Sequence, residues 1–160
     1  MASVPSSRIR NVALVGHGGS GKTTLAEALL FGSGAIPRMG RVEDGTATTD
    51  TEPEELKRQL SASLALATFT WHDHKINLLD CPGYADFFGE VEAALSVADL
   101  AVFVVSAVDG VEVQTELAWR LAAERRLPRL VFVNKLDRER ASFDNTFEQL
   151  KDAFAWKAIG

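Results

Sequence analysis

The chain has 160 residues, of which 46% are hydrophobic and 24% are charged, and its net charge at pH 7 is −5. This is enough chain for one domain with a buried core, and the composition is ordinary for a soluble globular protein. We expect no membrane helix, because no apolar run approaches the roughly 18 residues that such a helix needs, and no secretory leader, because residues 1–10 lack an apolar stretch. The acidic balance predicts no general attraction to DNA or RNA, and the single cysteine, Cys81, fits a reducing cytoplasm.

The first part of the chain alternates a strand and a helix and then loses its periodicity. Ile9–Val15 is apolar and rich in strand-favouring residues, which predicts a buried strand that leads directly into a glycine-rich turn. Thr23–Phe31 predicts a helix that ends at glycines. Residues 32–60 are rich in glycine, threonine and acids, and a structureless segment of this length is usually functional or mobile.

The second part predicts a hairpin and then further strands and helices. Leu64–Trp71 and Lys75–Asp80 flank a turn at residues 72–74. The later elements are predicted as helix Asp86–Val97, strand Leu100–Ser106, helix Val113–Arg126, buried strand Leu130–Asn134 and helix Ser142–Trp156, capped by Ser142. This alternation predicts an α/β fold: a mostly parallel sheet with one antiparallel hairpin and helices on both faces. Ligands of such sheets bind at the carboxyl ends of the strands, where the motifs of this chain lie.

The residues after the first predicted strand match the phosphate-loop pattern of a glycine, four residues and then Gly-Lys-Thr. Glycines let successive backbone N–H groups turn inward around an anion, and the helix that starts there adds its positive end. We predict that Lys22 reaches the β- and γ-phosphates, as a catalytic candidate, and that Thr23 binds Mg²⁺. The predicted phosphate-binding residues are Gly16, His17, Gly18, Gly19, Ser20, Gly21, Lys22, Thr23 and Thr24.

A second strand end carries Asp80, followed by Cys81, Pro82 and Gly83. An acidic residue at this place can hold Mg²⁺, usually through a water molecule. The absence of a side chain at Gly83 would let its backbone N–H approach the γ-phosphate, which makes Gly83 a further catalytic candidate. A purely structural alternative, in which Asp80 caps the following turn, stays open.

The segment Asn134-Lys135-Leu136-Asp137 follows another predicted strand and indicates a guanine nucleotide. The Asp137 carboxylate can accept hydrogen bonds from N1–H and the 2-amino group of guanine, and adenine lacks both donors. We predict that Asn134 bonds to the base and ties its loop to the phosphate loop, and that the Lys135 stem covers the base plane. The predicted cofactors are therefore GTP or GDP and Mg²⁺.

With these motifs the chain resembles the translational GTPases, and elongation factor G most closely, from about residue 10 to about residue 154. The likeness includes residues 74–80 and 84–87, and its most distinctive part is Gly110-Val111-Glu112-Val113-Gln114-Thr115-Glu116. The resemblance implies a phosphate-loop NTPase of the G-domain fold. It also implies a GTP-hydrolysing factor that acts on the ribosome in the cytoplasm, with Mg²⁺ as cofactor.

Three departures from the family pattern bear on activity. Gly19 stands where the family often has an acidic residue. Residues 58–61 align with the family's Arg-Gly-Ile-Thr, so that Ser61 is a further candidate ligand for Mg²⁺. Tyr84 stands where the family usually has the histidine that positions the attacking water, and a phenol is a poor match for that role. We therefore expect slow hydrolysis, and a likeness to a divergent elongation-factor-G-like branch.

The resemblance further implies that a last guanine-contacting loop, a sixth strand and a closing helix belong after Asp137. Residues 1–160 are therefore expected to be a truncated GTP-binding domain of a larger factor, with the C-terminal strand and helix missing. Three alternatives stay open: a module that holds a nucleotide without turning it over, an inert truncation, and a ribosomal protection or release factor.

Two further groups of residues are predicted to be structural. An aromatic and aliphatic stripe on the last helix is expected to face the core, and it comprises Phe143, Phe147, Leu150 and Phe154. A group of arginines is expected to be solvated surface in preference to an RNA contact, and it comprises Arg120, Arg125, Arg126, Arg129, Arg138 and Arg140.

Overall fold

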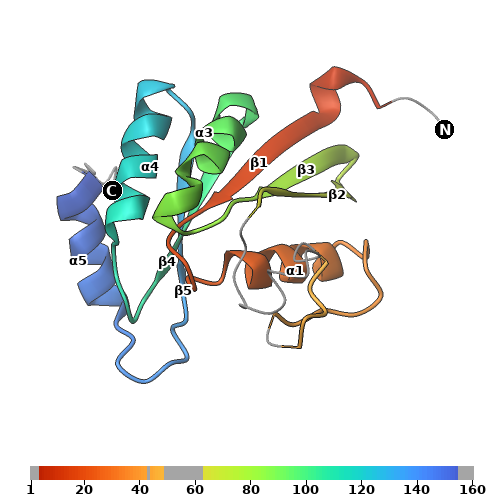
Figure 1. Cartoon of the computed structure of the whole chain (residues 1–160). Helices are drawn as coiled ribbons and strands as arrows, with labels where there is room; N and C mark the ends of the chain where they lie inside the picture. Colours follow the sequence, from red (N-terminus) through yellow and green to blue (C-terminus); the bar gives the residue numbers. More distant parts are fainter. Residues whose placement is uncertain (1–3, 43, 49–62, 155–160) are drawn as a thin grey trace.

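The computed structural model has a five-stranded sheet with the strand order β2-β3-β1-β4-β5 (Figure 1). It describes residues 4–42, 44–48 and 63–154. The strands are β1 (Ile9–Val15), β2 (Ala65–Trp71), β3 (His74–Asp80), β4 (Leu100–Ser106) and β5 (Arg129–Asn134). β1 pairs in parallel with β3 and β4, β4 pairs in parallel with β5, and β2 pairs antiparallel with β3. This is the predicted sheet, with its one antiparallel hairpin.

Helices cover both faces of the sheet, as predicted. α1 (Lys22–Gly32) lies on one face, and α3 (Phe88–Val97), α4 (Val113–Glu124) and α5 (Phe143–Phe154) lie on the other (Figure 1). Short 3₁₀ turns, η1 (Ser6–Arg8) and η2 (Ala85–Phe87), precede β1 and α3. The helix predicted from Asp86 therefore begins later as an α-helix, because the backbone of Phe87 (φ −108°, ψ 20°) is not helical. Within the described ranges, every helix is too short or too polar to cross a membrane.

The hairpin turn is tighter than the sequence predicted. Trp71 pairs directly with His74, so that His72 and Asp73 alone form the turn. Both have positive φ values, 43° and 62°. A two-residue turn with left-handed backbone at both positions matches the right-handed twist of the strands that it joins.

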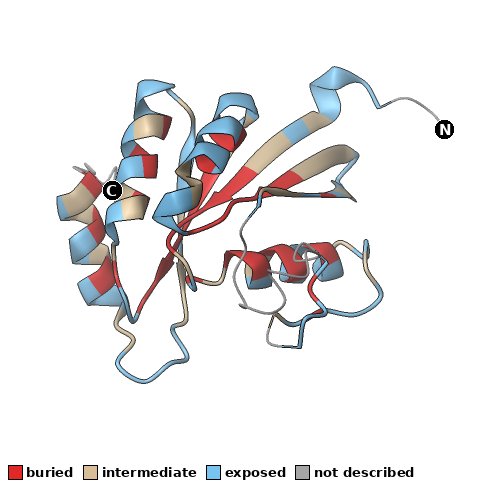
Figure 2. Ribbon diagram, viewed as in Figure 1, coloured by how far each residue is buried: buried red, intermediate tan, exposed pale blue. Residues whose placement is uncertain are grey.

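The core lies in two layers, one on each side of the central strands (Figure 2). Under α1, the buried residues include Leu14 of β1 and Val104 of β4. On the other face, Phe103 packs with Trp119 of α4 and Phe154 of α5. The rings of Trp119 and Phe154 are stacked, with their centroids 4.0 Å apart. β4 and the second half of β1, residues 12–15, are continuously apolar because both of their faces are covered, whereas Arg10 in the first half of β1 is exposed.

Two predictions about burial were wrong in part. β5 is not a buried strand: Leu130 is 48% exposed and Phe132 is 39% exposed. These residues pair with Val102 and Val104, so they share the α1 face, but β5 lies at the end of the sheet, further from α1 than β1 and β4. Central strands are covered from both sides, and a strand at the sheet edge is covered less.

The stripe on α5 faces the core only in its second half, where Leu150 and Phe154 are buried. Phe143 is 49% exposed, and its ring stacks on that of Phe147. The predicted cap is present, since the Ser142 hydroxyl accepts a hydrogen bond from the Asn145 backbone N–H at 3.2 Å. All of the arginines predicted to be solvated surface are exposed.

Candidate nucleotide-binding site

The turns that follow β1, β3 and β5 border one cavity of about 900 Å³. This volume is that of a site for a small-molecule ligand, which in proteins spans roughly 300–1,000 Å³. The cavity brings together residues from all three predicted motifs. Those that line it are Gly18, Gly19, Gly21, Lys22, Thr23, Thr24, Gly83, Tyr84, Asn134, Lys135 and Asp137.

Two glycines of the phosphate loop stand where a side chain does not fit. A Cβ on Gly16 would overlap the backbone carbonyl oxygen of Val104 in β4. Gly21 has a φ of 99°, and a Cβ there would overlap the side-chain nitrogen of Asn134. Gly21 is also the residue before the first turn of α1, so that the positive end of this helix starts at the cavity. The glycine spacing in the sequence thus reflects close packing against β4 and against the last residue of β5.

Lys22 and Gly83 meet at the inner side of the phosphate loop. The Lys22 side chain is 5% exposed, and its Nζ donates a hydrogen bond to the His17 carbonyl oxygen at 2.9 Å. A Cβ on Gly83 would overlap the Gly18 backbone nitrogen and lie within 2.6 Å of the Lys22 Nζ. The turn after β3 therefore packs backbone to backbone against the phosphate loop, which requires glycine at position 83.

The two predicted Mg²⁺ ligands that the structure describes lie side by side. The Thr23 hydroxyl donates a hydrogen bond to Oδ2 of Asp80 at 2.8 Å, and both residues are buried. A hydroxyl and a carboxylate are hard oxygen donors of the kind that Mg²⁺ prefers, so this pair fits the ion. The third predicted ligand, Ser61, lies outside the described residues.

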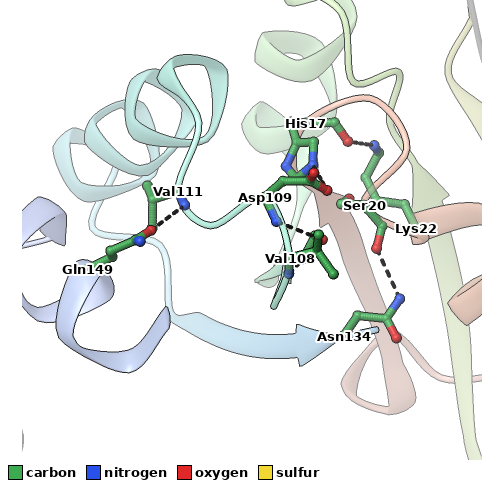
Figure 3. A network of polar contacts seen from close by, with 9 residues as sticks. His17, Ser20, Lys22, Val108, Asp109, Val111, Asn134 and Gln149 are labelled. Carbon is green, nitrogen blue, oxygen red and sulfur yellow. Dashed lines mark hydrogen bonds and ion pairs between the residues drawn. The ribbon is translucent and has the colours of Figure 1, made fainter. Parts of the chain in front are cut away.

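His17 and Ser20 have buried side chains that do not line the cavity. The His17 Nε2 lies 3.5 Å from Oδ2 of Asp109, in the loop after β4 (Figure 3). Burial lowers the pKa of His17 below 6.5, and the Asp109 carboxylate opposes this shift. The pKa of Asp109 is lowered by a hydrogen bond with the Ser106 side chain and by His17. Neither of these two predicted contacts places its side chain in the cavity, and the Ser20 backbone N–H donates a hydrogen bond to the His17 carbonyl oxygen at 3.3 Å.

The expected link between the guanine motif and the phosphate loop is present (Figure 3). Asn134 Nδ2 donates a hydrogen bond to the Ser20 carbonyl oxygen at 3.0 Å. Lys135 has a φ of 61°, which marks a sharp change of chain direction after β5. The Asp137 side chain is 80% exposed and lies 3.7 Å from the Arg138 guanidinium. Asp137 therefore keeps its carboxylate accessible at the rim of the cavity.

One wall of the cavity was not predicted from the sequence. Besides Arg138, the additional lining residues are Met39, Gly40, Arg41, Val42 and Asp44. They fall in the segment that was expected to be functional because of its length, but nothing in its pattern marked individual positions. Their place depends on contacts with α1, which periodicity does not report.

The chain is similar to a known family of domains along most of its length. Residues 7–159 match the family model described as the elongation factor Tu GTP binding domain. The chain is 43% identical over 150 residues to elongation factor G of Salinibacter ruber, which covers 94% of the chain and 21% of the relative. It is 42% identical over 148 residues to the mitochondrial ribosome-releasing factor 2 of Candida dubliniensis, which covers 92% of the chain and 18% of the relative.

A crystal structure of a protein from Thermus thermophilus is similar to the chain with a TM-score of 0.86 and 48% sequence identity. The similarity covers 92% of this chain and 22% of that protein. The chain thus spans about a fifth of the length of the relatives that it matches.

Proposed function

The chain belongs to the family of elongation factor Tu GTP binding domains, and on this basis we propose that it binds GTP and GDP with Mg²⁺ and hydrolyses GTP slowly. In this proposal residues 1–160 are the GTP-binding part of a larger translation factor that acts on the ribosome in the cytoplasm. One observation carries the proposal: a single cavity joins the phosphate loop to Asn134 and Asp137. Thr23 lines this cavity, and its hydroxyl lies 2.8 Å from Oδ2 of the buried Asp80 behind it.

The phosphates would be held by the loop between β1 and α1. Backbone N–H groups at the start of α1 offer hydrogen bonds and a positive partial charge to an anion. Lys22 is buried and fixed by its bond to the His17 carbonyl, so that its charge is already in place for the β- and γ-phosphates. Gly83 would bring its backbone N–H toward the γ-phosphate, because its backbone already packs on the phosphate loop.

Mg²⁺ would be held by Thr23 and Asp80, and when bound it would neutralise part of the charge on the β- and γ-phosphates. Tyr84 is 38% exposed and its ring lies directly over Gly18. A phenol in this position can donate or accept one hydrogen bond to water, but it is a weak proton acceptor. The proposed turnover is slow for this reason.

The guanine base would be recognised by Asp137 and Asn134. The exposed Asp137 carboxylate is free to accept two hydrogen bonds from one edge of guanine. Asn134 donates one of its two side-chain N–H groups to the Ser20 carbonyl oxygen, and the second N–H can donate to an acceptor on the base. The Lys135 stem would cover one face of the ring.

Two other functions have support of their own. Tyr84 favours a module that holds GTP or GDP without turnover. The likeness to a protein named ribosome-releasing factor 2 favours a release-type factor, within the same group of ribosome-acting GTPases. The holding module differs from the main proposal in that it does not hydrolyse GTP, and the release-type factor differs in the step of translation that it serves. All three functions require selectivity for guanine nucleotides.

The test is a competition assay with fluorescent GDP. We expect GTP and GDP to bind at least about a hundredfold more tightly than ATP, which corresponds to roughly 3 kcal/mol for the paired guanine donors. Asp137→Asn should shift the preference toward xanthine nucleotides, and Asp144→Asn, an exposed control on α5, should not. Equal competition by ATP and GTP would refute the guanine assignment. A single-turnover assay of GTP cleavage with and without Mg²⁺ then separates the GTPase from the holding module.

A further inference from the structure

Glu27 is a buried acid that the proposed chemistry does not use. It lies on α1, and its exposed fraction is 0%. Glutamate is seldom fully buried unless its charge is satisfied. Here the carboxylate accepts two backbone hydrogen bonds: the Gly40 N–H donates to Oε2 at 2.8 Å, and the Thr48 N–H donates to Oε1. Both donors come from the segment that follows α1.

Arg41 and Thr46, which lie between these two donors, are hydrogen-bonded to each other. The Arg41 N–H donates to the Thr46 hydroxyl oxygen at 2.9 Å, and the Thr46 N–H donates to the Arg41 carbonyl oxygen at 3.0 Å. A Cβ on Gly40 would overlap the Thr46 carbonyl oxygen, so the closed turn requires glycine there. Glu27 therefore holds the backbone immediately before and shortly after a closed turn.

This turn is a wall of the nucleotide cavity. The residues of the turn and its approach that line the cavity are Met39, Gly40, Arg41, Val42 and Asp44. Glu27 itself is not among the lining residues. Its effect on a bound nucleotide must therefore pass through the backbone that its carboxylate holds at Gly40 and Thr48.

We propose that Glu27 is a positioning residue for nucleotide binding, which fixes the turn between Gly40 and Thr48 to α1 as a wall of the cavity. The inference rests on the proposed function. The two N–H donors offset the cost of burying the carboxylate, and in return the carboxylate holds both ends of the turn. A side chain without these acceptors releases both ends together, and a nucleotide then has to order the turn as it binds.

The experiment compares Glu27→Ala and Glu27→Gln with Glu124→Gln, an exposed control on α4. Hydrogen exchange at the Gly40 and Thr48 amides, measured without nucleotide, reports whether the Glu27 carboxylate anchors the two ends of the turn. The dissociation rate of fluorescent GDP reports whether this anchoring contributes to nucleotide binding, and thermal unfolding identifies any variant that does not fold. We add Thr46→Val, which loosens the turn at an exposed residue and leaves α1 intact.

We expect both amides to exchange faster in Glu27→Ala and GDP to dissociate about tenfold faster, from the loss of charge-assisted hydrogen bonds. Glu27→Gln keeps one carbonyl acceptor and should lie between Glu27→Ala and wild type. Thr46→Val should show a smaller increase in GDP dissociation, and Glu124→Gln should show none.

Wild-type GDP dissociation rates in folded Glu27→Ala and in Thr46→Val would overturn the positioning role, and so would unchanged exchange at Gly40 and Thr48. A wild-type chain that fails to bind GDP would overturn the proposed function as well. The two failures are therefore distinguishable, because the second is measured on the wild type alone.

Discussion

Replacement of Asn134 tests whether the link between the guanine motif and the phosphate loop contributes to binding. In Asn134→Ala the hydrogen bond to the Ser20 carbonyl, 3.0 Å long and partly buried, is lost. A net loss of about 1 kcal/mol for the bond, with part of the desolvation cost of the unpaired carbonyl, gives about 1–2 kcal/mol for the link alone, and loss of the proposed base contact would add to it. This corresponds to roughly 5- to 30-fold weaker GDP binding.

Asn134→Asp sharpens the test, because the two side chains have the same shape. It would place a carboxylate oxygen against the Ser20 carbonyl oxygen, so we expect weaker binding than in Asn134→Ala. Asn145→Ala on the exposed side of α5 is the matched control. The assay is stopped-flow fluorescence with labelled GDP, with thermal unfolding of each variant measured in parallel. GDP affinity within twofold of wild type in folded Asn134→Ala, or tighter binding by Asn134→Asp than by Asn134→Ala, would refute the reasoning.

Three other residues give separate predictions. Tyr84→His, in the complete factor, should raise ribosome-stimulated GTP hydrolysis without a change in GTP affinity, and equal rates would show that Tyr84 is not limiting. The pKa of His17 is lowered, so the unfolded chain binds more protons than the folded chain below pH 6.5, and the melting temperature should fall as the pH drops through that value. The melting temperature of His17→Gln should fall less over the same pH range. Parallel plots of melting temperature against pH for the two proteins would contradict this prediction. Burial raises the pKa of Cys81 to about 12, so at pH 8 its thiol should react with iodoacetamide at least about a hundredfold more slowly in the folded chain than in denaturant.

The sequence predicted best what depends on local composition. β4 has the predicted bounds, because a strand covered on both faces carries continuous apolar residues; β1 also has the predicted bounds, although Arg10 and Asn11 interrupt its apolar run. The phosphate loop was also predictable, since its glycines are demanded by backbone packing at positions such as Gly16 and Gly21. These are constraints that every chain with this local geometry has to meet.

What could not be predicted depends on partners distant in the chain. The exposure of Leu130 follows from the place of β5 at the end of the sheet, and the residues of β5 are as apolar as those of a central strand. Glu27 lies in an ordinary helical sequence, and its burial is explained only by the Gly40 and Thr48 amides. Asp109 likewise acquires its relation to His17 only when the loop after β4 meets the phosphate loop.

The place of β1 in the sheet has a consequence for the way that the chain folds during its synthesis. β1 is made first, yet its partners come late: Ile9 pairs with Lys75, and Val12 pairs with Leu100. The loop-closure entropy of such distant pairings is lost before their contacts form, which makes them slow. The phosphate loop also rests on Val104. A nascent chain that has not reached β4 therefore lacks both the partner strand that covers the apolar side chains of β1 and the backbone on which Gly16 packs.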